Sequence, residues 1–275
     1  MIKLNFSEFN RIYEDILKLI MSHWTPEMQS EMARYNSGWN HSEYDFEIYL
    51  RLSSNRFYRA YRYILGSDGV QSVCDVGGFW GILAMILKQL GSPKVFMTES
   101  LKYYSNAFDG LFNCISNHGV EIIDFDPFEK HEHLPGKFDI ITLMAVLEHY
   151  PHSLSIIMRN IRDMLEDDGT VYLEVPNIAY WPKRVDLLFG KTPLPTISSI
   201  YRSQIPFIGH HHEFTIYELY ELALLSKFQI YSESYYTYSV NPYHWKYAIR
   251  HPVHMIMDYF RKRTRECISV VMKRT

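Results

Sequence analysis

Apolar residues at helical spacing mark the first quarter of the chain. Phe9, Tyr13 and Leu17 recur every four residues, and the apolar residues of 49–64 repeat this spacing after a polar stretch. Side chains at this spacing lie on one face of a helix. The pattern predicts an N-terminal helical cap over residues 1–68, ahead of a main domain over residues 69–275.

Between residues 70 and 176, short apolar runs alternate with helical patterns. The runs are residues 71–76, 94–99, 120–124, 138–144 and 170–175. Helical spacing lies between them, over residues 82–90, 103–117 and 154–165. This alternation is typical of an α/β fold whose mostly parallel sheet has helices on both faces. Such sheets bind ligands at the carboxyl ends of their strands, so the residues after each run are the candidates for chemistry.

The pattern loosens after the last of these runs. Prolines and glycines interrupt residues 177–214, which we expect to form a long lid over the sheet. Helical spacing resumes at Thr215, and a strand pattern follows at residues 228–235. A second insertion, helical in pattern, occupies residues 240–263 and precedes a final apolar run.

The composition suits a folded cytoplasmic protein. Hydrophobic residues make up 47% of the 275 residues and the net charge is only −3, which excludes a disordered chain. No apolar run is long enough to cross a membrane, and the first residues do not resemble a signal peptide. The three cysteines lie far apart, without the spacing of a disulfide frame or a zinc site. We therefore expect a cytoplasmic location.

The charge argues against a nucleic-acid partner, although the end of the chain is basic. The sequence pI is about 6.5, whereas nucleic-acid binders usually have a strong basic surplus. Residues 243–275 carry eight Lys or Arg against two acids, a surplus of six. We interpret this surplus as a solvated helix face, with a site for an anionic substrate or partner as the alternative. The segment 243–262 is also a candidate for a homodimer contact or a membrane-surface helix.

The first apolar run ends in an acidic, glycine-rich turn. Asp75 lies in the run, and Gly77, Gly78 and Gly81 follow it. Glycines let the chain turn sharply and let a ligand approach bare backbone, although a tight turn alone would also use them. A dinucleotide site has the spacing Gly-x-Gly-x-x-Gly, and Asp75 would repel its pyrophosphate. The turn therefore favours a ligand that carries an ammonium and a sulfonium.

Acidic residues also follow the second and third runs. A carboxylate at Glu99 can accept two hydrogen bonds from a ribose diol. Asp126 can accept a hydrogen bond from an adenine amino group, with Phe125 against the face of the ring. The alternative for either acid is an exposed position at a strand end or in a turn.

Together, these motifs resemble those of the class I S-adenosylmethionine-dependent methyltransferases. The matching segments are Asp75-x-Gly77-x-x-x-Gly81, Glu99, Asp126, Phe138-Asp-Ile-Ile-Thr-Leu-Met-Ala-Val-Leu-Glu-His149, Asp168-Gly-Thr-Val-Tyr-Leu-Glu-Val-Pro-Asn177 and His212-Glu-Phe-Thr-Ile-Tyr-Glu-Leu219. The resemblance covers residues 70–275. The Val-Leu-Glu-His segment resembles the small-molecule branch of ubiquinone-methyltransferase-like and MetW-like proteins.

The resemblance implies a fold, a cofactor and roles for individual residues. The fold is a Rossmann-like, seven-stranded sheet whose last strand is antiparallel, and the cofactor is S-adenosyl-L-methionine. The acidic turn, Glu99 and Asp126 would bind this cofactor, and Met144 and Glu148 would frame its pocket. Phe79 departs from the family pattern, because it replaces the middle glycine of Asp-x-Gly-x-Gly-x-Gly. Its ring must point away from the cofactor, or the loop must use Gly78 instead.

Histidines are the candidate catalytic residues. His149, at the mouth of the sheet, is a candidate general base, although framing the cofactor pocket is the alternative. His210 and His212 are further candidates, because alternate residues of an extended chain point to one side. With His211 they can contact the substrate, and with Glu213 they can clamp a phosphate or a metal, while plain loop polarity is the remaining alternative. We expect no metal ion.

Aromatic and basic side chains are candidates for acceptor contacts. Tyr35 and Trp39 of the cap are expected to roof the sulfonium, which aromatic faces attract. Trp181, Tyr201 and Arg202 lie in the lid, and Arg202 can bind a phosphate or a carboxylate. Packing in the core is the alternative for the aromatic residues.

We therefore expect a methyltransferase that O-methylates a small-molecule or carrier-linked acceptor, such as a sugar or a phosphorylated or nucleotide-linked metabolite. A lipid or quinone acceptor is the second hypothesis, because residues 245–263 are apolar and basic. A nucleotide-dependent oxidoreductase is disfavoured by Asp75. A catalytically silent, cofactor-binding relative is the remaining alternative, since it would also explain Phe79. The mild charge disfavours an RNA methyltransferase.

Overall fold

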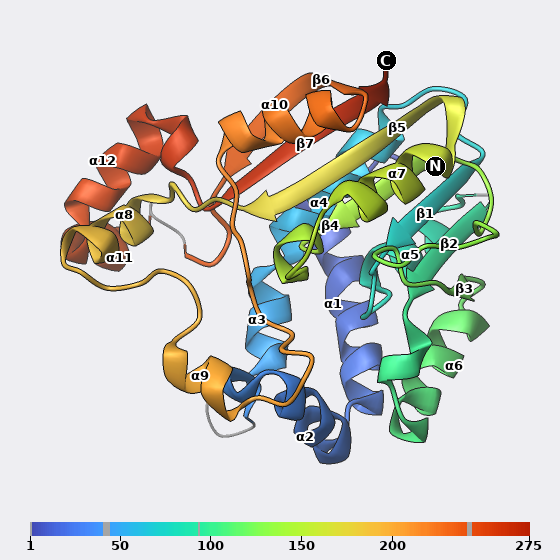
Figure 1. Cartoon of the computed structure of the whole chain (residues 1–275), viewed down its shortest axis with the longest axis horizontal. Coiled ribbons are helices and arrows are strands. Elements are labelled where there is room, and N and C mark those ends of the chain that lie inside the picture. The colour runs from blue at the N-terminus through green and yellow to red at the C-terminus, as the bar shows by residue number, and fades with distance from the viewer. Residues whose placement is uncertain (1, 41–44, 93, 241–243) are drawn as a thin grey trace.

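The core of the fold is a mostly parallel sheet (Figure 1). This computed structural model describes residues 2–40, 45–92, 94–240 and 244–275, and within them the sheet has seven strands in the order β3-β2-β1-β4-β5-β7-β6. The strands are β1 Ser72–Val76, β2 Lys94–Glu99, β3 Glu121–Asp124, β4 Phe138–Met144, β5 Leu165–Pro176, β6 Phe228–Tyr236 and β7 Cys267–Arg274. Strands β1 to β5 pair in parallel, and β7 is antiparallel to β5 and β6. The predicted Rossmann-like sheet with an antiparallel last strand is confirmed.

Helices cover both faces of the sheet. Because neighbouring strand residues point to opposite faces, Val73 and Ile140 contribute to one hydrophobic core while Cys74 and Ile141 contribute to the other. The first core includes residues of α1 Phe6–His23, α4 Ser54–Leu65, α5 Ile82–Gln89 and α6 Asp109–Asn117. The second includes residues of α7 Ser155–Asp163 and α10 Ile216–Leu225. Burial on both faces explains why the strands read as nearly continuous apolar runs.

The N-terminal cap shares the first of these cores with the sheet. Besides α1 and α4, it contains α2 Pro26–Tyr35, η1 Ser37–Trp39 and α3 Phe46–Leu52. Helix α1 begins at a capping box in which Asn5 and Glu8 satisfy each other's backbone N–H groups. The α1 residues Phe9, Tyr13 and Leu17 are fully buried, which explains their helical spacing in the sequence.

A buried ion pair fastens the cap to the sheet. Arg56 of α4 and Glu174 of β5 are 5% and 0% exposed, and Arg56 Nη2 lies 2.7 Å from Glu174 Oε1. Arg56 Nη1 also donates to the Tyr49 hydroxyl at 2.7 Å, and the Tyr236 hydroxyl donates to Glu174. A buried pair needs such additional hydrogen bonds, because both charges have lost their water.

The insertion over residues 177–214 returns to the sheet after contacting the cap. It contains two short helices, α8 Trp181–Leu188 and α9 Ile197–Arg202. The Ile208 N–H donates to the Tyr35 carbonyl at 2.8 Å, and in Figure 1 helix α9 lies beside α2. The insertion ends beside β5, where the Phe214 N–H donates to the Pro176 carbonyl at 3.2 Å.

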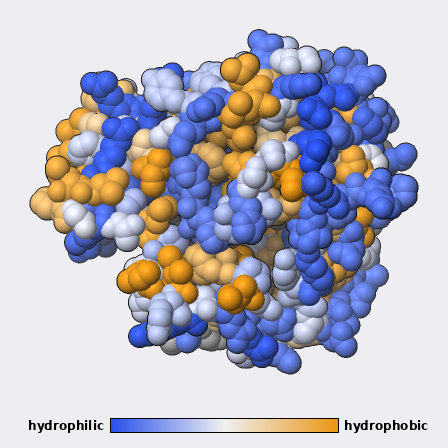
Figure 2. All heavy atoms as spheres, in the orientation of Figure 1, coloured by the Kyte–Doolittle hydropathy of each residue, from blue (hydrophilic) through white to orange (hydrophobic). Residues whose placement is uncertain are grey.

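A helical lobe projects from the body of the molecule, at the left of Figure 1. It consists of α8, α11 Trp245–Arg250 and α12 Pro252–Phe260. Several of its apolar side chains are exposed, among them Leu188, Trp245, Ile249 and Phe260. Figure 2 shows hydrophobic atoms gathered on this lobe. Residues 241–243, which belong to the second predicted insertion and include the first residue of the candidate dimer segment, lie outside the described residues.

Short 3-10 helices occur in the connections. They are η2 Leu101–Tyr103, η3 Asn106–Phe108, η4 Leu147–His149 and η5 Lys262–Thr264. Among the residues that the structure describes, no helix combines the length and the apolar character needed to span a membrane.

The ion pair between the cap and the sheet yields a stability prediction. The Arg56→Ala variant should lose about 3–5 kcal/mol of unfolding free energy, because it leaves the Glu174 carboxylate buried without its partner. Chemical denaturation monitored by circular dichroism measures this loss. Arg51→Ala is the matched control, since Arg51 pairs with Glu14 and Glu47 at the surface and its loss should change stability little. Equal losses in the two variants would contradict the prediction.

Candidate functional site

Polar side chains gather at the carboxyl edge of the sheet, where the strand order reverses. The chain runs outwards from β1 through β2 to β3 and then returns to β4 on the other side of β1. Open α/β sheets bind their ligands at such a switch point. Asp75, Glu99 and Glu148 lie at or just beyond the ends of β1, β2 and β4.

The turn after β1 requires its glycines. The backbone φ angle is +68° at Gly77 and +65° at Gly81, in the left-handed region that favours glycine. A Cβ atom on Gly77 would lie 2.9 Å from Val146 Cγ2, and one on Gly78 would lie 2.6 Å from Asp75 Oδ2. Both distances are shorter than real Cβ contacts, so side chains at these positions would displace the turn.

Asp75 is a buried carboxylate beneath this turn. It is 5% exposed, and the Thr142 hydroxyl donates to its Oδ1 at 2.5 Å. Burial raises the pKa of Asp75 to about 6, and the hydrogen bond from Thr142 opposes part of this rise. Thr142 lies opposite Asp75 in the register between β1 and β4. The sequence analysis missed it, although a threonine within the apolar run 138–144 was the available signal.

Glu99 holds the acidic turn from the side of β2. The Phe79 N–H donates to its Oε1 at 2.7 Å, and the Tyr104 hydroxyl donates to its Oε2 at 2.9 Å. Burial raises the pKa of Glu99 to about 7, against the opposing effect of these hydrogen bonds. Tyr104 was not identified from the sequence, because nothing in its local pattern links it to Glu99.

The ring of Phe79 points into an aromatic cluster. It is stacked on Tyr104 at a centroid distance of 5.3 Å and an interplanar angle of 7°, and it contacts Trp80 and Trp24 of the same cluster. Its backbone N–H meanwhile donates to Glu99. The structure thus assigns this unusual residue a position between the turn and the cap.

The candidate adenine-binding residues are engaged within the protein. Asp126 lies 3.0 Å from Lys102 Nζ, and its Oδ1 accepts the Phe128 N–H at 3.0 Å. Phe125 is 3% exposed, with its ring centroid 4.3 Å from that of His131. Their role towards adenine stays a prediction.

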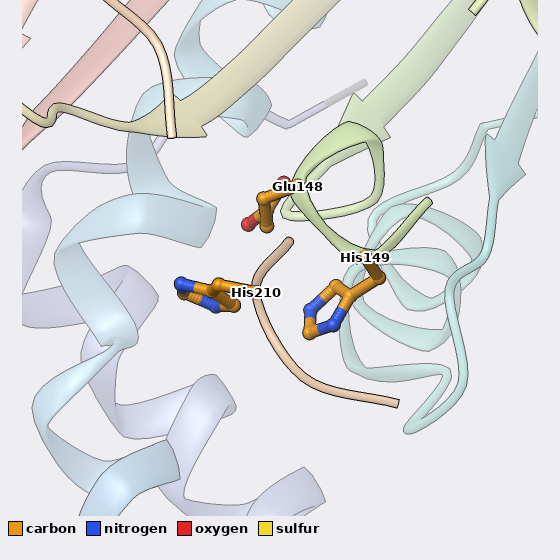
Figure 3. Close-up of side chains that lie close together, drawn as sticks. All are labelled: Glu148, His149 and His210. Carbon is orange, nitrogen blue, oxygen red and sulfur yellow. The ribbon is translucent and has the colours of Figure 1, made fainter. Parts of the chain in front are cut away.

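Three side chains with metal-ligand or base chemistry converge beyond β4 (Figure 3). Glu148 and His149 come from η4 and His210 from the end of the 177–214 insertion, and one ligand atom of each lies within 4.8 Å of the others. The His149 and His210 rings meet edge-to-face at a centroid distance of 4.9 Å. The backbone joins the two segments as well, because the His211 N–H donates to the Glu148 carbonyl at 2.7 Å.

Two of these three side chains carry buried polar atoms without partners. Glu148 is 1% exposed, and neither of its carboxylate oxygens has a hydrogen-bond partner among the described residues. The Nδ1 atom of His149 is likewise buried and unpartnered among them. Burial raises the pKa of Glu148 to about 7 and lowers the pKa of His149 to about 3. His149 is therefore neutral at physiological pH and weak as a general base.

A carboxylate orients His210 from behind. Glu213 Oε1 lies 2.9 Å from His210 Nδ1, and Lys183 forms an ion pair with the other Glu213 oxygen. Burial of Glu213, which is 5% exposed, opposes ionisation, but the hydrogen bond with His210 and the charge of Lys183 together lower its pKa. Because Nδ1–H of His210 donates to an ionised carboxylate, the Nε2 atom carries the free lone pair. Lys183 had not been identified from the sequence.

The other two histidines of the run face elsewhere. His211 Nε2 lies 3.0 Å from the Phe207 carbonyl oxygen, and His212 Nε2 lies 3.0 Å from Glu218 Oε1. Glu218 belongs to the capping box that starts α10, so His212 extends a helix cap. The structure joins His210, rather than His212, to the cluster around Glu148.

The remaining candidate residues lie at the end of β4, in the cap and in the 177–214 insertion. Met144 is half-buried at the end of β4, and Trp39 packs against the first hydrophobic core. The Tyr35 carbonyl binds the returning insertion, and Trp181 begins α8. Tyr201 is 88% exposed and Arg202 is also exposed at the end of α9. Their contacts with a ligand stay predictions.

One protein family matches most of the chain. A profile of the family described as "Methyltransferase domain" matches residues 46–233. No curated protein sequence matches the chain.

Similar solved structures share the fold at low sequence identity. The magnesium protoporphyrin IX methyltransferase from Synechocystis PCC 6803, solved with bound SAH, is 13% identical with a TM-score of 0.56, over 90% of this chain and 96% of that one. The mitomycin 7-O-methyltransferase MmcR is 13% identical with a TM-score of 0.51, over 96% and 68%. The pyocyanin biosynthetic protein PhzM is 17% identical with a TM-score of 0.50, over 83% of this chain and only 58% of PhzM.

The buried acids of the site predict how stability changes with pH. Glu99 has an ordinary pKa of 4.5 and a folded pKa of about 7, so the folded state binds its proton more tightly than the unfolded chain. This favours folding at low pH, and the contribution is lost as pH rises from about 4.5 to about 7. In the ligand-free protein, the unfolding free energy of wild type relative to Glu99→Gln should therefore decrease over this range, as urea denaturation at several pH values will measure.

The control for this measurement is Glu121→Gln, which changes an exposed residue of β3. Its stability relative to wild type should stay constant with pH. A constant difference between wild type and Glu99→Gln would contradict the raised pKa of Glu99.

Proposed function

This chain belongs to the methyltransferase-domain family, and on that premise we propose that it O-methylates a small-molecule or carrier-linked acceptor. It is an S-adenosylmethionine-dependent enzyme, and the identity of the acceptor is the proposed part. The observation that carries the proposal is the polar cluster of Glu148, His149 and His210, which lies at the end of the strand beside the acidic glycine turn.

The residues of the turn fit S-adenosylmethionine in charge and in hydrogen-bonding capacity. The cofactor carries an ammonium and a sulfonium, and the carboxylates of Asp75 and Glu99 are buried where these charges would offset the loss of water. Glu99 donates nothing when ionised and offers about four lone-pair sites, so it can bind a ribose diol besides Phe79 and Tyr104. When bound, the cofactor supplies a methyl carbon activated by the sulfonium.

The cluster beyond β4 suits an acceptor that is itself a hydrogen-bond donor. The two Glu148 oxygens, His149 Nδ1 and His210 Nε2 are lone-pair sites, and an acceptor hydroxyl would donate its hydrogen bond to one of them. An amine or hydroxyl fits this set of atoms, whereas an apolar carbon would leave buried polar atoms unpaired. We favour oxygen as the target atom. A hydroxyl generally needs a base to take its proton during methyl transfer, and this cluster offers lone pairs for that proton.

The same proposal includes the finer assignments. The Val-Leu-Glu-His149 segment supports the small-molecule branch of ubiquinone-methyltransferase-like and MetW-like proteins. We propose the division into a cap over residues 1–68 and a cofactor domain over residues 69–275, with lids at 177–214 and 240–263.

The free, buried thiols of Cys74, Cys114 and Cys267 support a reducing, cytoplasmic environment. A sugar or a phosphorylated or nucleotide-linked metabolite is the proposed acceptor class.

A lipid or quinone acceptor is the second candidate. The helical lobe of α8, α11 and α12 exposes Trp245, Ile249 and Phe260, and Arg261 and Lys262 follow directly. Apolar side chains beside cations are typical of surfaces that lie in a membrane interface. The lobe would then bring the site to an acceptor dissolved in the membrane.

Cofactor binding should depend on Glu99. The Glu99→Ala variant should bind S-adenosylhomocysteine more weakly by about 1.5–3 kcal/mol, the range for hydrogen bonds to a charged group. Isothermal titration calorimetry measures the change, and Asp68→Ala, at an exposed position before β1, is the matched control. Unchanged affinity in a folded Glu99→Ala protein would remove Glu99 from the cofactor site.

The fate of the transferred methyl group separates the two acceptor classes. Protein incubated with methyl-labelled S-adenosylmethionine and a fractionated metabolite extract should place the label on a water-soluble product. Label in the organic-soluble fraction instead would favour the lipid or quinone acceptor. Absence of label in both fractions, with tight S-adenosylhomocysteine binding, would indicate a catalytically silent relative.

A further inference from the structure

We propose that Glu148, His149 and His210 bind a divalent transition-metal ion, for which Zn²⁺ is the first choice, and that this ion binds the acceptor oxygen. The inference rests on the proposed function and replaces our expectation of a site without metal. Two nitrogens and one carboxylate from separate segments meet within 4.8 Å of one another (Figure 3). Two imidazoles and one carboxylate are a ligand set that zinc enzymes use, with a further position left open.

The unpartnered atoms of the cluster point to a missing cation. Glu148 is 1% exposed, and both its oxygens lack partners among the described residues. A carboxylate that is buried without hydrogen bonds or a counter-charge is strongly destabilising, and buried charges in proteins are paired or coordinate metals. The charge of Arg56 acts on Glu148, but its guanidinium is already committed to Glu174 and Tyr49.

Both histidines are oriented as metal ligands usually are. A metal-binding imidazole donates its second N–H to a carboxylate or a backbone carbonyl, which fixes the ring and its tautomer. His210 does so through Nδ1 to Glu213, which Lys183 holds in turn. His149 forms a hydrogen bond with the backbone of Gly209 and keeps a buried, unpartnered Nδ1. The lone pairs of both rings are therefore free on the nitrogens that remain.

The cluster is wider than a loaded zinc site. Two ligand atoms of a tetrahedral ion lie about 3.3 Å apart when the metal–ligand bonds are about 2.0–2.1 Å long. The limit in the cluster is 4.8 Å, so binding would draw the three side chains inwards by side-chain rotation. Imidazole nitrogens favour zinc, iron, cobalt and nickel over magnesium and calcium, which prefer oxygen ligands.

The ion would activate the acceptor hydroxyl and would restrict the class of acceptor that binds. A hydroxyl bound to the ion has a lowered pKa and releases its proton to water. The resulting alkoxide lone pair then forms the new O–CH₃ bond as the S–CH₃ bond of the donor breaks, giving a methyl ether and S-adenosylhomocysteine. Because zinc can expand from four to five ligands, an acceptor with two neighbouring oxygens, such as a vicinal diol or a hydroxy acid, would bind best.

Metal titration of the untagged, chelator-stripped full chain tests the inference. Wild type should bind one equivalent of Zn²⁺, measured by competition with a chromophoric chelator, and Co²⁺ should give a visible absorption band. Glu148→Gln and His210→Ala should weaken binding at least 100-fold, and Glu213→Gln by about 10–100-fold, the range for loss of an orienting partner. His152→Ala, an exposed histidine near the cluster, is the matched control and should bind as wild type does.

The outcomes separate this inference from the proposed function. Wild type that takes up no Zn²⁺ or Co²⁺ at micromolar concentrations overturns the metal site, as does equal affinity in His210→Ala. Calorimetry with S-adenosylhomocysteine on the same variants shows whether they remain folded and bind the cofactor. Methyl transfer that survives chelation would also overturn the metal site, yet it would leave the proposed function standing.

Discussion

The burial of carboxylates along one edge of the sheet is the constraint on which this structure depends. Asp75, Glu99 and Glu174 belong to β1, β2 and β5, Glu148 follows β4 in η4, and each is less than a tenth exposed. Removing a carboxylate from water costs several kcal/mol unless a hydrogen bond or an opposite charge replaces the water. Much of the surrounding fold supplies these hydrogen bonds and opposite charges.

The hydrogen bonds and the opposite charge come from the neighbouring strand, the turn and the cap. The neighbouring strand gives Asp75 a threonine hydroxyl, the turn and an aromatic residue serve Glu99, and the cap contributes Arg56 to Glu174. Only at Glu148 do the described residues supply nothing to either oxygen. The edge is thus complete except at Glu148, the position that we propose for a cation or a substrate hydroxyl.

The periodic parts of the fold could be predicted from the sequence, and the contacts between distant segments could not. Strands with both faces buried leave long apolar runs, and the glycines of the turn are required by its backbone, so both are visible locally. The partners of His210 and Glu99 depend on how segments far apart in the chain pack together. Because alternate residues of an extended chain point to one side, we predicted that His210 and His212 lie together. In the structure, His212 instead contacts Glu218 in the capping box at the start of α10. Lys183, Tyr104 and Arg56 carry no local signal for the same reason.

Phe79 joins the cap to the glycine turn after β1. Here the ring is inserted among Trp24, Trp80 and Tyr104, so the loop and the first helices share one set of aromatic contacts. A chimera that takes its N-terminal segment from another protein would therefore remove Trp24 from these contacts and leave the turn after β1 without part of its support.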